Sequence, residues 1–260
     1  MLIQEDFVDL KTAQGVMRTF IFRPVAVGEF PGIVLFAEIY QMTGPIARTA
    51  RLIASQGYVV AVPEIYHDFE PPGSPFAYNT ADTEKGNRYK IEKTIASYDA
   101  DARACIEHLM TRADCNGRLG CVGICLGGHL CIRCAMNPEI LAGVSFYATD
   151  VHSRTLGQGK QDNTLDRLSE IKAEMLMIWG KQDPHIPLAG RQRIYNTLNE
   201  VGVNFTWHEF NAQHAFMRDE GHRYNPALAE ICHALLFELF SRTLQLGVTT
   251  APDGSLQQSC

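Results

Sequence analysis

A glycine-rich turn between a buried strand and a helix is the feature that most restricts how this chain can fold. The residues are Gly123-Ile124-Cys125-Leu126-Gly127-Gly128, which follow the apolar run 119–124 and precede a helical pattern. A residue on such a tight strand-to-helix turn is strained, and small neighbours are needed because the two backbones approach closely. The turn therefore predicts a strand packed against the helix that follows it, which is typical of an α/β fold.

The rest of the chain alternates in the same way. Short β-prone runs are separated by helical patterns, which predicts a mostly parallel sheet with helices on both faces. We expect strands at 3–10, 17–22, 33–37, 58–62, 119–124, 141–147, 175–179 and 205–210. We expect helices at 45–56, 91–110, from 126 onward, 188–201 and 226–244. Without a repeat or an internal linker, the simplest organisation is one domain over 1–246 and a loose tail over 247–260.

The segment 64–88 is irregular around Pro71-Pro72-Gly73-Ser74-Pro75. It passes over the surface either as a rim or lid of a site or as a passive loop, and the sequence does not distinguish the two.

Composition excludes several classes of protein. The chain has 260 residues, a hydrophobic fraction of 46% and a formal charge of -6, with no run of Lys or Arg that would suit nucleic acid or an acidic membrane surface. Its start lacks the pattern of a signal peptide, and no apolar run approaches the roughly 20 residues that cross a bilayer. These features predict a cytoplasmic protein without a nucleic-acid or membrane partner; a monomer and a dimer both remain possible.

Eight cysteines are present, and most lie inside apolar runs. Free thiols behave there as small hydrophobic side chains, so we expect reduced cysteines rather than disulfides. Cys131 and Cys134 have a C-x2-C spacing, but no second ligand pair at zinc spacing accompanies them. Core packing is therefore expected for this pair, and no metal or other cofactor is predicted.

The glycine-rich turn also has the spacing of a nucleophile elbow, with Cys125 at the central position. Such a turn holds the thiol at the carboxyl edge of the sheet near a helix N-terminus, which favours a thiolate and an oxyanion. The alternative is a plain glycine-rich turn with a buried cysteine. Asp183 and His214 follow the next predicted strand ends in the order nucleophile, acid, histidine. Separately, Asp183 could cap a turn and His214 could be a loop histidine.

Together the three residues predict nucleophilic catalysis on the α/β-hydrolase fold. Cys125 would attack an acyl carbonyl, His214 would accept its proton and later activate water, and Asp183 would orient the imidazole. The N–H of Leu126 would be one oxyanion donor.

The sequence resembles the dienelactone hydrolase family from about residue 20 to residue 244. The resemblance rests on the elbow, on Trp179-Gly180-Lys181-Gln182-Asp183, on His214-Ala215-Phe216-Met217-Arg218 and on Glu38-Ile39-Tyr40. It implies that Glu38 holds the resting thiol and takes its proton when substrate arrives. It also implies a second oxyanion donor at the N–H of Ile39.

The resemblance further implies that Arg218 binds a substrate carboxylate, a task that suits the planar guanidinium. The family has a second carboxylate-binding arginine before the helix that starts near residue 91. Arg88 and Lys85 are the candidates, and we expect Arg88 to bind substrate. Tyr147 belongs to a motif that only partly matches the family's aromatic pair, and we expect it to line the pocket.

These features predict a hydrolase of a small carboxylated ester or lactone, with dienelactone to maleylacetate as the leading case and an acyl-thioester intermediate. One alternative is a broad carboxylesterase or thioesterase in which Arg218 points elsewhere. Another, from a different class, is a catalytically idle α/β-hydrolase fold that binds a small ligand.

Overall fold

The fold is centred on one eight-stranded sheet, in a computed structural model that describes residues 1–246, 248–250 and 256–258. The strands are β1 (Ile3–Thr12), β2 (Gly15–Pro24), β3 (Phe30–Phe36), β4 (Val59–Pro63), β5 (Cys115–Ile124), β6 (Ile140–Phe146), β7 (Glu174–Gly180) and β8 (Phe205–Phe210). Their order is β1-β2-β4-β3-β5-β6-β7-β8. Strands β1 and β2 run antiparallel to their neighbours, and β3 to β8 are parallel.

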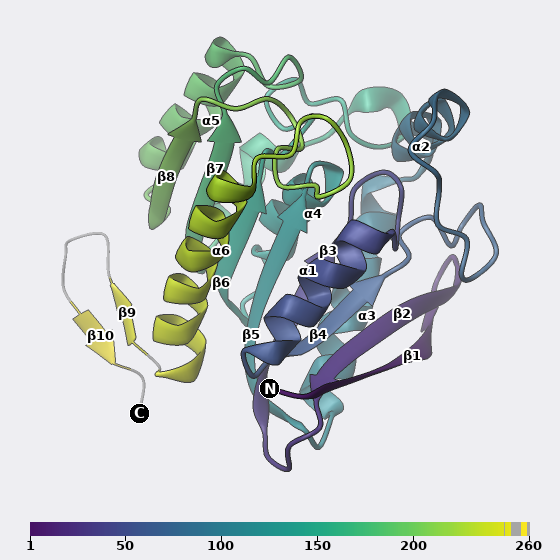
Figure 1. The fold of residues 1–260 in the computed structure, drawn as a ribbon. Helices are drawn as coiled ribbons and strands as arrows, with labels where there is room; N and C mark the ends of the chain where they lie inside the picture. The colour runs from purple at the N-terminus through teal and green to yellow at the C-terminus, as the bar shows by residue number, and fades with distance from the viewer. Residues whose placement is uncertain (247, 251–255, 259–260) are drawn as a thin grey trace.

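Helices cover both faces of this sheet (Figure 1). They are α1 (Gly44–Ser55), α2 (Thr80–Glu92), α3 (Ile95–Thr111), α4 (Leu126–Cys134), α5 (Leu188–Glu200) and α6 (Pro226–Phe240). Helices α3 and α4 pack together on one face, whereas α1 and α6 lie in front of the other. Every residue of β4 and β7 is buried, as expected for strands covered on both sides. The predicted α/β-hydrolase fold is confirmed by this architecture.

The segment 64–88 is less irregular than we predicted. Helix α2 covers Thr80–Glu92, within and just after this segment, and α3 begins at Ile95. The range 91–110, expected to be one helix, therefore includes the end of α2 and most of α3, separated by Lys93 and Thr94. The sequence hid α2 because it is mostly polar and buries only Gly86 and Tyr89. Its start is fixed instead by Asn79, whose side chain accepts a hydrogen bond from the N–H of Asp82.

Shorter elements complete the chain. They are the 3-10 turns η1 (Gln158–Lys160) and η2 (Thr164–Glu170), the π-helical turn η3 (Ser241–Gln245), and the antiparallel pair β9 (Val248–Thr250) and β10 (Leu256–Gln258). The tail predicted over 247–260 thus contains one short strand pair, and its remaining residues lie outside the described part.

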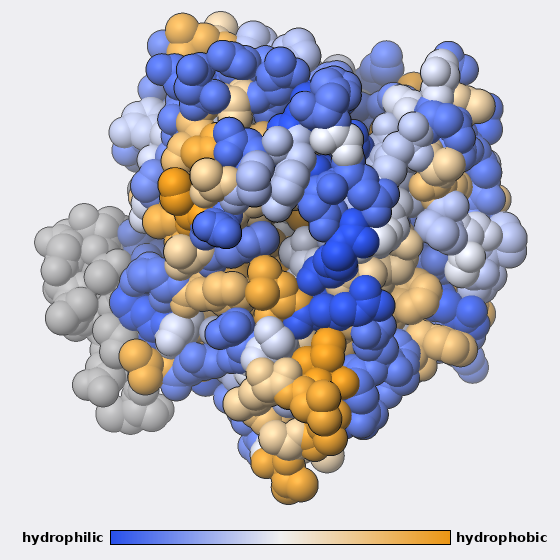
Figure 2. Space-filling model, in the orientation of Figure 1, coloured by the Kyte–Doolittle hydropathy of each residue, from blue (hydrophilic) through white to orange (hydrophobic). Residues whose placement is uncertain are grey.

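The face shown in Figure 2 is largely hydrophilic, and apolar side chains gather at its lower end. Met1, Leu2, Val25 and Val27 are all exposed, and the N–H of Val25 donates to the carbonyl of Leu2 at 3.0 Å. These residues lie at the amino ends of the parallel strands, away from the carboxyl edge. No helix in the described residues is long and apolar enough to span a bilayer.

The turn from β5 into α4 is the tightest junction of the fold. A Cβ on Gly123 would lie 1.8 Å from the carbonyl oxygen of Gly127, and a Cβ on Gly127 would lie 2.0 Å from that of Phe36. Cys125 itself has φ 62 and ψ -117, a strained conformation for a residue with a side chain. The glycines therefore let α4 start directly against the backbone of β3.

We expect Gly127→Ala to destabilise the protein by about 3 kcal/mol or more, because the methyl group would collide with backbone that cannot move independently. Alanine is favoured over glycine inside a helix by about 1 kcal/mol, so any loss must come from the collision. Thermal unfolding measured by circular dichroism tests this. The control is Gly202→Ala, since a Cβ there meets nothing within 4 Å and only the cost of φ +72 remains. Equal melting temperatures for the two variants would contradict the expectation.

Candidate active site

Three predicted site residues meet at the carboxyl edge of the parallel strands. Cys125 follows β5 directly, Asp183 lies in the loop after β7, and His214 lies in the loop after β8. The loops after β7 and β8 are joined by a hydrogen bond from the N–H of Gln182 to the carbonyl of Ala212, at 2.9 Å. Loops that extend from one edge of the sheet therefore bring Cys125 and His214, 89 positions apart in the chain, into contact.

The thiol, the imidazole and the carboxylate form a continuous hydrogen-bonded row. Nε2 of His214 lies 3.2 Å from Sγ of Cys125, and Nδ1 of His214 lies 2.6 Å from Oδ2 of Asp183. The other carboxylate oxygen of Asp183 accepts the N–H of His185 at 2.8 Å. With Oδ1 held by the backbone, Asp183 fixes both the tautomer and the orientation of His214.

The electrostatics of His214 favour its charged form. Burial lowers its pKa, but the negative charge of a Cys125 thiolate and the hydrogen bond that His214 donates to Asp183 outweigh burial and raise the pKa to about 10. His214 therefore keeps its proton at neutral pH when the sulfur is a thiolate. The arrangement can supply a nucleophile and, after attack, a general acid.

The two residues expected to supply oxyanion donors follow β5 and β3 in the chain. Leu126 is the first residue of α4, and its N–H is one of the orphan donors of a helix start. Ile39 follows β3 and lines the same pocket as Cys125. Within residues 1–246, neither N–H donates a hydrogen bond to a protein acceptor.

Glu38 lies in the pocket but is not hydrogen-bonded to the thiol. It is 2% exposed, accepts a hydrogen bond from the Tyr78 hydroxyl at 3.2 Å, and lies 3.9 Å from a guanidinium nitrogen of Arg218. Burial raises the pKa of Glu38, and this outweighs the opposite effects of Arg218, His214 and Tyr78. In this state the sulfur contacts His214 instead of Glu38.

Arg218 lines the pocket between the loops after β3 and β8. Its guanidinium stacks over the ring of Tyr78 at 4.2 Å, and its Nε donates to the carbonyl of Glu220 at 3.0 Å. Its side chain is 14% exposed, so it presents a held but accessible cation.

Two other predicted binding residues lie elsewhere. The Arg88 side chain is 58% exposed, lies 3.6 Å from Glu92 and does not line the pocket, because it points outward from α2. Tyr147 is fully buried, and its ring packs edge-on against the His214 imidazole with the centroids 5.1 Å apart. It therefore supports the imidazole from the protein interior. Lys85, the other candidate, bonds Glu70 at 2.5 Å, away from the thiol.

Several pocket residues were missed from the sequence. Lys90 of α2 reaches Asp150 at 2.9 Å, and both line the pocket. Arg223 lies five positions after Arg218 and lines it as well. Asp150 has φ 66, a strained value that would have marked the site, but backbone strain is not visible in a sequence.

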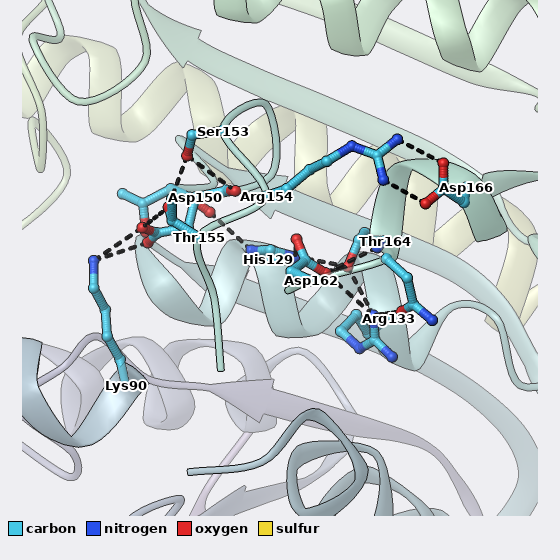
Figure 3. Close-up of polar contacts among 12 residues, drawn as sticks. Lys90, His129, Arg133, Asp150, Ser153, Arg154, Thr155, Asp162, Thr164 and Asp166 are labelled. Carbon is cyan, nitrogen blue, oxygen red and sulfur yellow. Dashed lines mark hydrogen bonds and ion pairs between the residues drawn. The ribbon is translucent and has the colours of Figure 1, made fainter. Parts of the chain in front are cut away.

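A buried polar network holds the segment after β6 in place (Figure 3). His129 of α4 is fully buried; its Nδ1 lies 2.9 Å from the carbonyl oxygen of Thr149 and its Nε2 lies 2.8 Å from Oγ1 of Thr164. Asp162 accepts from Thr164 at 2.6 Å and lies 3.3 Å from His129. Because Thr149 also donates to the carbonyl of Cys125 at 3.3 Å, the network ties the elbow to the pocket wall.

The described residues do not form a candidate metal site. The described residues contain no group of three or more His, Cys, Asp or Glu side chains placed to hold an ion. The seven described cysteines are free thiols.

Comparison with known proteins gives a consistent result. The dienelactone hydrolase family profile matches residues 17–244. A Saccharomyces cerevisiae protein named "Putative carboxymethylenebutenolidase" is 42% identical over 95% of this chain and 94% of its own length. The carboxymethylenebutenolidase of Pseudomonas putida is 28% identical over 78% of this chain and 82% of its own length.

Solved structures agree on the fold. A structure titled as a putative dienelactone hydrolase from Klebsiella pneumoniae has a TM-score of 0.79 at 21% identity, covering 93% of this chain and 100% of that one. The family profile and this structural match both extend over most of the chain. The chain therefore belongs to the dienelactone hydrolase family, and it is a hydrolase of ester or lactone bonds.

Proposed function

We propose that the chain hydrolyses a small carboxylated ester or lactone through Cys125, His214 and Asp183, with dienelactone to maleylacetate as the leading case. The observation that carries this proposal is the row of contacts from Cys125 Sγ to His214 Nε2 at 3.2 Å and from His214 Nδ1 to Asp183 at 2.6 Å. The names of the curated relatives support the leading substrate. Free thiols in a chain of this kind fit a reducing compartment, and we propose the cytoplasm.

The reaction follows from the protonation state of the pair. The Cys125 thiolate attacks the carbonyl carbon, and the resulting oxyanion accepts the N–H groups of Leu126 and Ile39. The His214 imidazolium gives its Nε2 proton to the departing alkoxide, which leaves an acyl thioester on Cys125. Neutral His214 then takes a proton from water, the hydroxide attacks the thioester, and the acid leaves as the thiolate reforms.

Substrate choice is assigned to Arg218. Its guanidinium is fixed by Tyr78 and by the carbonyl of Glu220, yet it is neutralised only loosely by Glu38 at 3.9 Å. A substrate carboxylate can therefore form a closer pair with it. Glu38 holds Arg218 toward the thiol and, with its raised pKa, is suited to take up a proton when substrate displaces the present contacts.

Cys125→Ala is expected to abolish turnover of cis- and trans-dienelactone and of a neutral aryl ester, because it removes the sulfur that contacts Nε2 of His214. Arg218→Gln is expected to lower kcat/KM for the dienelactones by about 10- to 100-fold, as expected for loss of a charged hydrogen bond. The neutral aryl ester serves as the control within each protein. Turnover retained by Cys125→Ala contradicts the triad; equal losses on charged and neutral esters contradict the role of Arg218.

Iodoacetamide is expected to label Cys125 at pH 7.5 before any other described cysteine, because His214 stabilises a thiolate there. Burial raises the pKa of Cys105, Cys115, Cys121 and Cys232, so these stay as thiols. His214→Ala should slow the labelling by about tenfold, which peptide mass spectrometry over time can measure. Slow labelling of the wild type would instead place the resting proton on sulfur, as the family resemblance implies.

Glu38→Gln tests the electrostatic cost of the buried carboxyl. The pKa of Glu38 is raised by burial in the folded protein. A carboxyl whose pKa is higher in the folded than in the unfolded state lowers the free energy of unfolding as pH rises through the folded pKa. The melting temperature of Glu38→Gln relative to wild type should therefore be higher at pH 8 than at pH 4, by circular dichroism. Glu84→Gln removes a charge from an exposed site and controls for net charge. A difference that is constant with pH would rule out a buried Glu38 that is costly to ionise.

A further inference from the structure

The catalytic pocket adjoins a second hollow. The inner pocket, of about 260 Å³, holds Cys125 and His214. The outer hollow, of about 580 Å³, lies between the start of α2 and the segment 218–223. The residues that line both are Tyr40, Thr83, Arg218 and Arg223. The two spaces therefore meet at these four side chains, and a ligand can extend from one into the other.

The junction is held in a fixed shape. The Tyr40 hydroxyl and Oγ1 of Thr83 are 2.8 Å apart, so α2 is tied to the loop after β3. Gly221 has φ +121, a conformation that favours glycine, and it lies beside the Arg218 guanidinium. The wall that the two hollows share is thus fixed by a contact between α2 and the loop after β3.

Arg223 is the cation at this junction that lacks a partner. Its Nε is buried without a hydrogen bond, and no described carboxylate lies within 4 Å of its guanidinium. The other two pocket cations are occupied: Lys90 by Asp150 at 2.9 Å, and Arg218 by the carbonyl of Glu220 and loosely by Glu38. A partly buried guanidinium without an anion is costly, and binding an anion removes that cost.

The acidic residues of the outer hollow do not satisfy Arg223. Glu220 lines the hollow but bonds Arg48 at 2.7 Å. Glu84 lines it too, with an exposed side chain on α2. The remaining charged or titratable residues of the hollow are Arg218, Arg223, His222, Tyr40 and Tyr78. The junction therefore favours an anionic ligand group.

We propose that the outer hollow is the distal half of the substrate site and that Arg223 binds a carboxylate there. The preferred substrates are then extended: the scissile carbonyl lies at Cys125 and a carboxylate lies at the far end of a chain that passes Tyr40 and Thr83. The inference rests on the proposed ester hydrolysis for its catalytic end. It assigns the distal anion to Arg223, which the family resemblance did not point to.

Calorimetric binding of straight-chain dicarboxylates to the wild-type enzyme tests this without any turnover. Succinate, adipate and suberate are each compared with the corresponding monoamide, which keeps the length but removes one charge. At the length that reaches Arg223, the diacid should bind at least about tenfold more tightly than the monoamide, as expected for a charged hydrogen bond. Arg223→Gln should reduce that ratio to about one, and Arg223→Lys should restore part of it.

Arg51→Gln is the matched control, because it also removes one arginine charge. Arg51 lies on α1, where it forms an exposed ion pair with Glu5 of β1. This variant should keep the wild-type ratio. Equal affinities of diacid and monoamide for the wild type at every length overturn the inference, as does a ratio that survives in Arg223→Gln. The wild-type comparison decides the question even if a variant misfolds. Cys125-dependent hydrolysis of a neutral aryl ester is scored separately, so that catalysis and distal binding can fail independently.

Discussion

The site depends on the contact between the start of α4 and the backbone of β3. Gly127 lies so close to the carbonyl of Phe36 that no side chain fits, and Gly123 meets the carbonyl of Gly127 in the same way. This approach forces Cys125 into a left-handed conformation and aims its sulfur out of the sheet edge. The strain at Cys125 is of order 1–3 kcal/mol, and it persists because hydrogen bonds on both sides fix the turn. The N–H of Cys125 donates to Phe146 at 3.1 Å, and its carbonyl accepts from Thr149 at 3.3 Å.

That dependence extends from the turn into the pocket wall. His129 holds the carbonyl of Thr149, so α4 orients the residue that precedes the strained Asp150. Behind it, Arg133 bonds the partly exposed Asp99 at 2.7 Å and lies 3.4 Å from the buried Asp162, so the buried charges of Arg133 and Asp162 are paired. Removing one member of such a network would leave the others uncompensated, which is far more costly than an exposed ion pair. The catalytic edge is therefore rigid for electrostatic as well as steric reasons (Figure 3).

The sequence was sufficient to predict the site residues that follow the ends of parallel strands. Cys125 and Asp183 follow strongly apolar runs and His214 follows a run of β-prone residues. Parallel strands place such positions at one edge, so their meeting could be predicted. Arg88 could not be judged in this way, because helix α2 has a weak pattern and its rotation decides which side chains face inward. Three positions on the same helix have different fates: Lys85 bonds Glu70, Arg88 points to solvent, and Lys90 reaches Asp150.

The sequence also could not predict whether a side chain at a strand end lines the pocket or is buried beneath it. The side chain of Tyr147 follows β6 and could have pointed into the pocket, but φ 37 turns it under His214 instead. Its hydroxyl is buried without a hydrogen-bond partner in the described residues, which no pattern of residue types would reveal. The resemblance to a family brought Glu38 and Arg218 to attention, and the structure adds that both share the space around Tyr78.

The charges of the pocket explain how one site can separate catalysis from recognition. Lys90 and Asp150 form an ion pair, Glu38 lies near Arg218, and the sulfur contacts His214, which in turn is paired with Asp183. Arg223 lies outside these pairs, and its charge is felt by Glu38, whose pKa it lowers slightly against the larger effect of burial. An anion bound to Arg223 would weaken that effect and favour protonation of Glu38. Binding at the distal end and proton uptake near the thiol are therefore linked through one buried carboxyl.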